Sequence, residues 1–210
     1  MWNSQVIIML LEGIRDTLYM TLASTLFGYI IGLPMGIVLT VTDKDGIRPN
    51  AAVYKVLDVI SNLLRSIPFI ILLIVLIPFT RFVVGRSYGS TATIVPLTIA
   101  AAPYIARMVE SSLKEVDAGV IEAARSMGAS DFQIVTKVML VEARTSLIVG
   151  ATISLGTILG YSAMAGTVGG GGLGDIAIRY GYTRWQTDIM VVTVVRLVIL
   201  FQIFQTIGMK

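Results

Sequence analysis

The chain has 210 residues, of which 55% are hydrophobic and 14% are charged. Soluble domains carry about 25% charged residues, so this composition favours a membrane protein. The chain has no cysteine and no histidine, which excludes disulfides, thiolate nucleophiles, imidazole bases and ordinary zinc sites. The net charge of +3 is too small to indicate binding to nucleic acid.

Five segments are apolar and long enough to cross a membrane, which takes about 20 residues in a helix. They lie at about 17–42, 56–80, 91–107, 145–166 and 188–208. Residues 1–12 are also apolar, but they form a short run that Glu12 ends. We expect this N-terminal segment to stay on the mature chain and to lie on the periplasmic side, in the membrane interface or against the bundle. The predicted fold is all-α, a polytopic membrane bundle of five transmembrane helices.

Small residues recur at helical spacing in two of these spans. Gly28, Gly32 and Gly36 are four residues apart in the first span, and Gly156 and Gly160 are four apart in the fourth. Glycines on one face of a membrane helix let a second backbone approach closely, so we expect these positions to pack helices together. Chance spacing is the alternative, because glycine is common in membrane helices. Prolines at positions 34, 68, 78 and 96 predict kinks within the spans.

The lysines and arginines that flank the spans predict the orientation, because cytoplasmic flanks carry more of them. With the N-terminus outside and the C-terminus inside, ten of these residues lie on the inner side and five on the outer side. The inner set is Lys44, Arg48, Lys55, Arg65, Arg107, Lys114, Arg125, Lys137, Arg144 and Lys210, and the outer set is Arg15, Arg81, Arg86, Arg179 and Arg184.

The longest polar segment, residues 108–144, follows the third span and carries the signals of two short helices. Asp117 is placed to cap the first helix, and Gly128 falls where the chain must turn left-handed to leave it. Ser130 and Gln133 form a capping box that begins the second helix. This segment is therefore predicted to be a helix, a tight turn and a second helix on the cytoplasmic face.

Each of the two helices has an apolar side, formed by Ile121 and Met127 in the first and by Phe132, Val135 and Met139 in the second. Such a segment either folds back on the bundle as an ordered loop or forms a docking surface for another protein, and the pattern leaves both open. Three small residues favour docking slightly, because they would let a partner approach the backbone: Ala123, Ala124 and Ala129.

The same loop resembles the EAA loop in the permeases of ATP-binding-cassette (ABC) importers. That pattern reads EAA, three residues, glycine, nine residues and then Ile-x-Leu-Pro. Here Glu122, Ala123 and Ala124 are followed by Gly128 at the matching spacing, and the pattern ends in Val-Met-Leu-Val without the proline.

Two further stretches are similar to the same superfamily. LRSIPFIILL, at Leu64–Leu73, is similar to the start of the second core helix in importers for amino acids and related solutes. AGTVGGGGLGDIA, at Ala165–Ala177, is similar to the glycine-rich outer loop of methionine and quaternary-amine permeases. The resemblance covers residues 13–206 and is strongest to methionine importer permeases, with permeases for quaternary amines (betaine or choline) as the alternative.

The resemblance implies the type I ABC importer permease fold, a multi-pass position in a bacterial inner membrane and a non-catalytic role. It also implies a homodimer, two ATPase subunits on the cytoplasmic side and an extracytoplasmic substrate-binding protein. ATP and Mg would be bound by the partner ATPase, and this chain would bind no cofactor. Glu122 would orient the loop by pairing with Arg125, Arg107 or the partner. The residues that would couple this chain to the ATPase are Glu122, Ala123, Ala124, Arg125, Gly128, Ala129, Ser130 and Asp131.

The glycine run Gly169–Gly174 is followed by Asp175 instead of the lysine of a phosphate loop, so we expect a turn on the outer side that cannot hold ATP. At the outer end of the fourth span, a flexible and apolar methionine would suit a pathway gate. The candidates for lining it are Ser162, Ala163, Met164 and Ala165. The alternative for these four residues is an ordinary contact with lipid or with another helix.

Arg196 is the deepest charge within a span, and we expect it to pair locally or to extend toward the interface. A channel or secondary transporter that works without ATP is a rival prediction, but the spans hold no histidine, no acid near their middle and no convincing repeat. An enzyme embedded in the membrane is the weakest alternative, because the spans contain no lysine and Asp58 is the nearest approach to an intramembrane acid. No metal site is expected.

Overall fold

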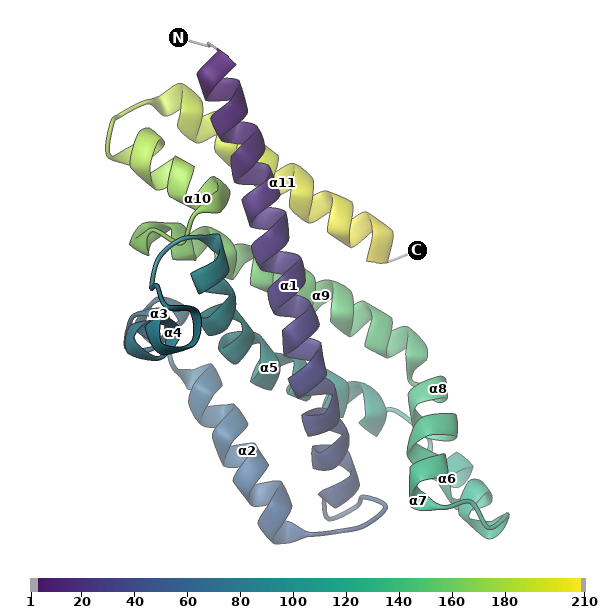
Figure 1. Cartoon of the computed structure of the whole chain (residues 1–210). Coiled ribbons are helices and arrows are strands. Elements are labelled where there is room, and N and C mark those ends of the chain that lie inside the picture. Colours follow the sequence, from purple (N-terminus) through teal and green to yellow (C-terminus); the bar gives the residue numbers. More distant parts are fainter. Residues whose placement is uncertain (1–3, 209–210) are drawn as a thin grey trace.

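The computed structural model describes residues 4–208, and within that range every regular element is a helix. Figure 1 shows α1 running the length of the molecule, with α10 and the start of α11 near its N-terminal end and α6 and α7 near its other end. The bounds are α1 Ser4–Thr42, α2 Ala51–Ser66, α3 Phe69–Val75, α4 Ile77–Val84, α5 Ser90–Lys114, α6 Ala118–Ser126, α7 Asp131–Gln133, η1 Ile134–Met139, α8 Leu140–Glu142, α9 Arg144–Ala165, η2 Gly166–Val168, α10 Gly172–Ile176, η3 Ala177–Tyr182 and α11 Thr187–Gly208.

The number of spans depends on one bent pair of helices. Within the described range, α1, α5, α9 with η2, and α11 are each long and apolar enough to cross a membrane. The pair α2 and α3 passes the same test together, although its axis bends by 102°. Counting that pair as one span gives five, so the predicted all-α membrane bundle is confirmed.

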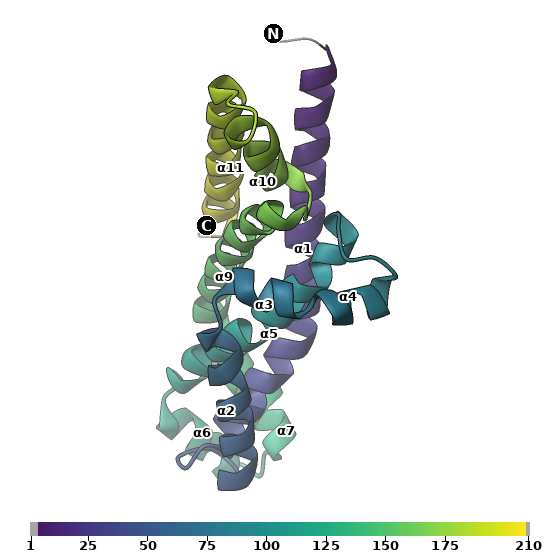
Figure 2. The same ribbon diagram turned by 90° about the vertical axis from the view of Figure 1, so that its left-hand side faces the viewer.

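The second predicted span, 56–80, is not one continuous helix. Proline restricts the residue before it to extended backbone, and Ile67 has φ −82° and ψ 124° directly before Pro68. The chain leaves α2 there and continues as α3 and α4, which Figure 2 shows lying across the bundle. The kink predicted at this proline is therefore a full change of direction.

Two predicted boundaries also differ from the structure. Residues 4–12 are the first turns of α1 and not a separate segment. Within these turns, the side chain of Leu10 is fully buried against Ile176 and Ile189. The third span continues to Lys114, seven residues beyond the predicted end at 107. The polar loop is shorter than predicted because its charged first residues find partners, described below, that keep them helical.

The most extensive helix–helix contact in the described bundle lies between α1 and α5. A Cβ added to Gly32 would lie 2.6 Å from the carbonyl oxygen of Ala102, and one on Gly36 would lie 2.6 Å from that of Ala106. Both glycines are buried, as is Gly28 one turn earlier. Gly32 and Gly36 meet the backbone of α5, and Gly28 meets the side chains of Ala101 and Ile105, so this face of α1 requires residues without a side chain.

The two glycines of the fourth predicted span differ from each other. A Cβ on Gly156 would lie 2.6 Å from the ring of Phe201 in α11, whereas one on Gly160 would meet nothing within 4 Å. Gly156 thus lies in the α9–α11 contact, and Gly160 has no packing partner among the described residues.

The glycine-rich stretch closes the end of the bundle opposite α6. The hydroxyl of Thr17 accepts a hydrogen bond from the Leu173 amide at 2.9 Å, and the hydroxyl of Thr93 donates to the Gly170 carbonyl at 3.2 Å. A Cβ on Gly174 would lie 2.1 Å from the carbonyl oxygen of Ala163. The stretch is therefore a tight turn packed against α1, α5 and α9.

Candidate functional site

Residues 118–142, from α6 to α8, form a helical elbow at one end of the bundle. Asp117 Oδ1 accepts a hydrogen bond from the Gly119 amide at 2.7 Å, and Gly128 has φ +84°. The Ser130 hydroxyl accepts from the Gln133 amide at 3.3 Å, while Gln133 Oε1 accepts from the Ser130 amide at 2.9 Å. The predicted cap, left-handed turn and capping box are all confirmed.

The apolar residues of the elbow divide into two groups. Ile121, Val135 and Met139 pack against a buried cluster at this end of the bundle. In contrast, Met127 is 83% exposed and Phe132 is 76% exposed. The two alternatives that the sequence left open therefore divide between the residues, since three apolar side chains fold back on the bundle and these two do not. Met127 and Phe132 form an apolar knob at the turn of the elbow, which no residue in the range 4–208 covers.

The small residues of the elbow also divide. Ala124 is 5% exposed and belongs to the buried cluster, and Ala129 packs against that cluster. Only Ala123 is exposed. The hypothesis that these alanines offer backbone to a partner is therefore excluded for the buried Ala124, which instead lets the elbow approach the bundle, and it stays a prediction for Ala123.

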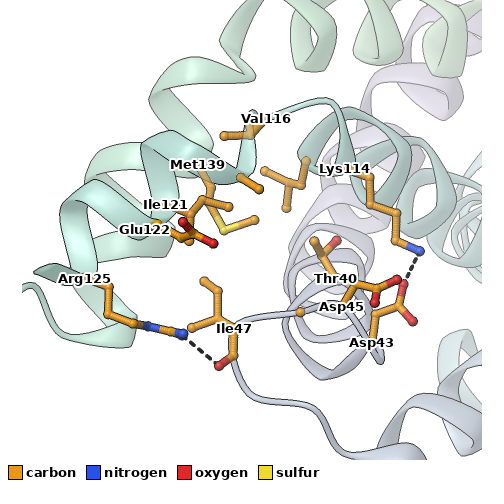
Figure 3. A pocket seen from close by; sticks show the side chains of 13 residues that line it. Thr40, Asp43, Asp45, Ile47, Lys114, Val116, Ile121, Glu122, Arg125 and Met139 are labelled. Carbon is orange, nitrogen blue, oxygen red and sulfur yellow. Dashed lines mark hydrogen bonds and ion pairs between the residues drawn. The ribbon is translucent and has the colours of Figure 1, made fainter.

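A polar cavity of about 420 Å³ separates the elbow from the loop between α1 and α2 (Figure 3). The Glu122 side chain lines it, and its carboxylate makes no hydrogen bond or ion pair with any residue in the range 4–208. The expected pairing of Glu122 with Arg125 or Arg107 is therefore wrong. Arg125 donates instead to the carbonyl of Ile47 at 2.9 Å, and the partners of Arg107 are carboxylates on α2 and α5.

The α1–α2 loop is fastened to both the elbow and α5. Besides the Arg125–Ile47 hydrogen bond, Ile47 packs against the same buried cluster as the elbow. At the other end of the cavity, Lys114 Nζ lies 2.6 Å from Asp43 Oδ2. The loop therefore connects α1 to the elbow through contacts that no local pattern in the sequence predicts.

The hydrogen bond from Lys114 holds the pKa of Asp43 below its ordinary value. A lowered carboxyl pKa stabilises the folded protein above the unfolded pKa of about 4, and that contribution is lost as the pH falls through the lower folded value. The contact of Asp43 with Lys114 is therefore present at any pH near neutral.

A charged network behind the loop ties α2 to α5. Arg107 pairs with Asp58 of α2 and, at 2.7 Å, with Glu110 of its own helix. Glu110 is buried and also accepts from Lys114 at 2.8 Å. Residues 108–114 belong to the longest polar segment and were predicted to be loop, so the sequence did not indicate this network, although positions 107, 110 and 114 share one face of α5.

We expect Arg125→Ala to loosen the α1–α2 loop without unfolding the elbow. The hydrogen bond to Ile47 is worth about 1 kcal/mol at an exposed site, which corresponds to about a fivefold change in local opening. Amide hydrogen exchange should therefore be about fivefold faster in residues 43–50 and nearly unchanged in α6. The control is Arg144→Ala, which also removes an exposed arginine but none that bonds the loop. Equal exchange in the two variants would contradict this role.

The four gate candidates do not line one surface. Ala165 is fully buried against Met20 and Leu97, and the buried Ser162 donates to the Leu159 carbonyl at 2.8 Å. Ala163 is partly exposed, and Met164 is 47% exposed. Among the four, Met164 has the most exposed side chain, and a gate at these positions stays a prediction.

Within the described range, no group of three or more acidic, cysteine or histidine residues is placed to hold a metal ion.

The deep charge of α11, Arg196, keeps its Nη1 atom buried without a hydrogen-bond partner among residues 4–208. The expected local pairing of that nitrogen is therefore wrong for the single chain.

Known transport proteins are similar to this chain in sequence and in the arrangement of their helices. The probable D-methionine transport system permease protein MetI of Vibrio cholerae is 49% identical over 200 residues, covering 95% of this chain and 89% of that protein. The D-methionine transport system permease protein MetI of Escherichia coli is 54% identical over 158 residues, covering 75% and 73%. A structure of the MetNI methionine ABC transporter in inward-facing conformations has a TM-score of 0.97 at 50% identity, covering 99% of this chain and 96% of that one.

A more distant structure, an amino acid ABC transporter, shares the fold with a TM-score of 0.79 at 20% identity, covering 97% of this chain and 92% of that one. Residues 18–208 match a family described as the inner membrane component of binding-protein-dependent transport systems. This match covers most of the chain and agrees with the EAA pattern of the elbow, so the chain belongs to the family of binding-protein-dependent transport system inner membrane components.

Proposed function

We propose that this chain is the membrane-spanning permease subunit of an ATP-driven methionine importer. The observation that carries the proposal is the 49% identity to a D-methionine permease across 95% of the chain. The inward-facing MetNI transporter supports it with the same arrangement of helices. None of the relatives described above is a permease for quaternary amines, the alternative substrates.

Two copies of the chain form the pathway, and two separate ATPase subunits dock on their elbows. The sequence has no phosphate loop, so the energy comes from those subunits, which bind ATP and Mg. An extracytoplasmic binding protein delivers substrate to the opposite end. The elbow then faces the cytoplasm and the N-terminus faces outward, in agreement with the excess of Lys and Arg on the elbow side.

The elbow transmits movement of the ATPase because it is stiff. Its capping hydrogen bonds and buried cluster fix both short helices, so a push on one end displaces the other instead of deforming a loop. The displacement passes directly to α9, whose first residue follows α8 after Ala143. It also passes to α1 through the loop that Arg125 holds. The bundle responds by exchanging inward-open and outward-open states.

The test is purification of the chain with its co-expressed neighbours, followed by reconstitution in liposomes with the binding protein. We expect an ATPase to co-purify and methionine uptake to require ATP, while betaine and choline are not taken up. ATP-dependent uptake of a quaternary amine in place of methionine would overturn the assignment of methionine as the substrate. Uptake without ATP, or the absence of an ATPase partner, would overturn the whole proposal.

We expect Phe132→Asp to weaken binding of the ATPase. A phenylalanine that is 76% exposed in this chain and becomes buried in a partner contributes about 1.5–3 kcal/mol, which corresponds to about a 10–150-fold loss of affinity. The matched control is Phe132→Leu, which keeps an apolar side chain at the knob. The measurement is the fraction of ATPase retained during size-exclusion chromatography as the complex is diluted. If the aspartate variant retains the ATPase as well as the leucine variant does, the knob is not the docking surface.

A further inference from the structure

The turn between η3 and α11 has an unusual backbone. Trp185 has φ +58° and is the only non-glycine residue with positive φ in the range 4–208. Left-handed backbone costs an ordinary L-residue about 1–2 kcal/mol, and glycine or asparagine occupies such positions more easily. The Gln186 amide donates to the Tyr180 carbonyl at 3.2 Å across this turn, a bond that does not itself require a large ring at position 185.

Among residues 4–208, no packing of the Trp185 side chain offsets the free-energy cost of its left-handed backbone. Trp185 is 86% exposed, and the neighbouring Tyr182 is 68% exposed. Two large aromatic rings therefore extend from a single turn into the surroundings of the molecule. Whether those rings stabilise the protein depends on whether water or lipid surrounds them.

The turn lies at the level where the hydrocarbon of a membrane must end. The helix α11 has 22 residues and is about 33 Å long, close to the roughly 30 Å of a bilayer core. Only 11% of its most apolar stretch is buried within the chain, so most of its surface is available to lipid. Trp185 comes two residues before Thr187, the first residue of α11.

The start of α1 indicates the same edge of the membrane hydrocarbon, independently of α11. Gln5 and Met9 line one cavity together with Tyr180 and Arg184, so the first turns of α1 lie beside this turn. In those turns Ile7, Ile8 and Leu11 are each about half exposed, at 49%, 54% and 58%. Figures 1 and 2 both show the beginnings of α1 and α11 at the same end of the molecule. Apolar surface thus continues up to the turn from two helices.

The side chains of the turn have the chemistry of a membrane–water interface. Tryptophan and tyrosine combine an apolar ring with a polar group and are enriched at headgroup level. The Arg184 guanidinium lies over the Tyr180 ring at 4.5 Å, a position from which it can reach phosphate oxygens while its stem stays apolar.

We propose that residues 180–187 anchor this end of the permease in the phospholipid headgroup region, with Trp185 and Tyr182 inserted at the hydrocarbon boundary. The proposal commits to lipid instead of the binding protein because the exposed rings continue the apolar surface of α11 and α1. The anchor itself does not depend on the substrate. Its consequence rests on the proposed function: this end of α11 stays at a fixed depth while the elbow moves.

The depth of Trp185 is measured by fluorescence of the reconstituted transporter complex. Subtracting the emission of a Trp185→Phe complex isolates the signal of this one residue from all other tryptophans. We expect strongest quenching by lipids brominated close to the headgroup, weaker quenching by lipids brominated near the chain end and little quenching by acrylamide in the water. Strong quenching by acrylamide with none by either lipid would overturn the anchor, as would strongest quenching by the deep label.

A second measurement uses the absence of cysteine in the chain. Thr187→Cys introduces the chain's single thiol at the start of α11, and its reaction with a water-soluble maleimide in liposomes reports exposure. Adding Trp185→Asn, which tolerates left-handed backbone, should raise that rate several-fold while ATPase assembly stays unchanged. An equal rate with and without the ring would overturn the anchor. Shielding of Trp185 that occurs only when the binding protein is added would also overturn it, and would identify a protein contact instead.

Discussion

Gly32→Leu should disrupt the α1–α5 contact and with it the stability of the whole permease. A Cβ at this position would lie 2.6 Å from the Ala102 carbonyl oxygen and 2.9 Å from Ile105 Cβ. The first of these neighbours is backbone in the middle of α5, so it cannot turn away. The two helices must separate, which costs about 1–3 kcal/mol for overpacking alone and more when the neighbouring contacts at Gly28 and Gly36 are lost with it.

The measurement is the midpoint of thermal unfolding of the purified complex, together with its yield. The matched control is Gly160→Leu, because a Cβ there would meet nothing within 4 Å in this chain. Both substitutions replace a glycine in a spanning helix by the same side chain, so only the space differs. If the two variants unfold at the same temperature, close backbone packing between α1 and α5 does not hold the bundle together.

Gly128→Val should separate ATP hydrolysis from transport. Gly128 has φ +84°, and a Cβ there would meet nothing within 4 Å, so the effect arises from the backbone and not from a clash. A β-branched residue is strained in this conformation by about 1–3 kcal/mol. The turn relieves that strain by opening, which changes the angle between the two elbow helices. We expect at least about a tenfold loss of methionine uptake, equivalent to about 1.4 kcal/mol of coupling, while hydrolysis continues.

Gly85→Val provides the matched control for that experiment. Gly85 has φ +79° and also has nothing within 4 Å of an added Cβ, but it lies after α4, away from the elbow. It therefore adds the same kind of strain without altering the elbow. Uptake per ATP hydrolysed should stay near that of the unaltered chain in Gly85→Val and fall in Gly128→Val. Equal ratios in the two variants would show that the geometry of the elbow turn does not control coupling.

Features with a local cause could be predicted from the sequence. The fourth and fifth spans were predicted at 145–166 and 188–208, and the helices are Arg144–Ala165 and Thr187–Gly208. Their boundaries follow from apolar length alone. The elbow was equally predictable, because a cap at Asp117, a left-handed glycine and a capping box each depend on a few adjacent residues.

Features that depend on distant partners could not be predicted. Glu110 and Lys114 are charged and were assigned to a loop, yet they stay in α5 because Arg107 pairs with Asp58 and Lys114 pairs with Asp43. No spacing along one sequence shows that these groups meet. The same holds for Arg125, whose partner Ile47 is 78 residues away.

The exposed apolar residues show a second feature of the fold that the sequence could not predict. Met127 and Phe132 satisfy the helical pattern of inward-facing residues as well as Ile121 and Met139 do. Only the fold separates the two pairs, because the elbow approaches the bundle on one side and leaves its turn uncovered. An apolar side chain in the sequence predicts burial, but it does not say whether the burial occurs within the chain or against a second protein.

The length of α1 gives the molecule a lever with unequal arms. Its contact with α5 centres on Gly32, ten residues from Thr42 and 28 from Ser4, the two ends of the helix. At 1.5 Å per residue these arms are about 15 Å and 42 Å long. If α1 rotates about that fulcrum, its far end travels nearly three times as far as the end fastened to the elbow. Under the proposed function, a modest stroke of the ATPase at the elbow would thus be magnified at the opposite end of α1.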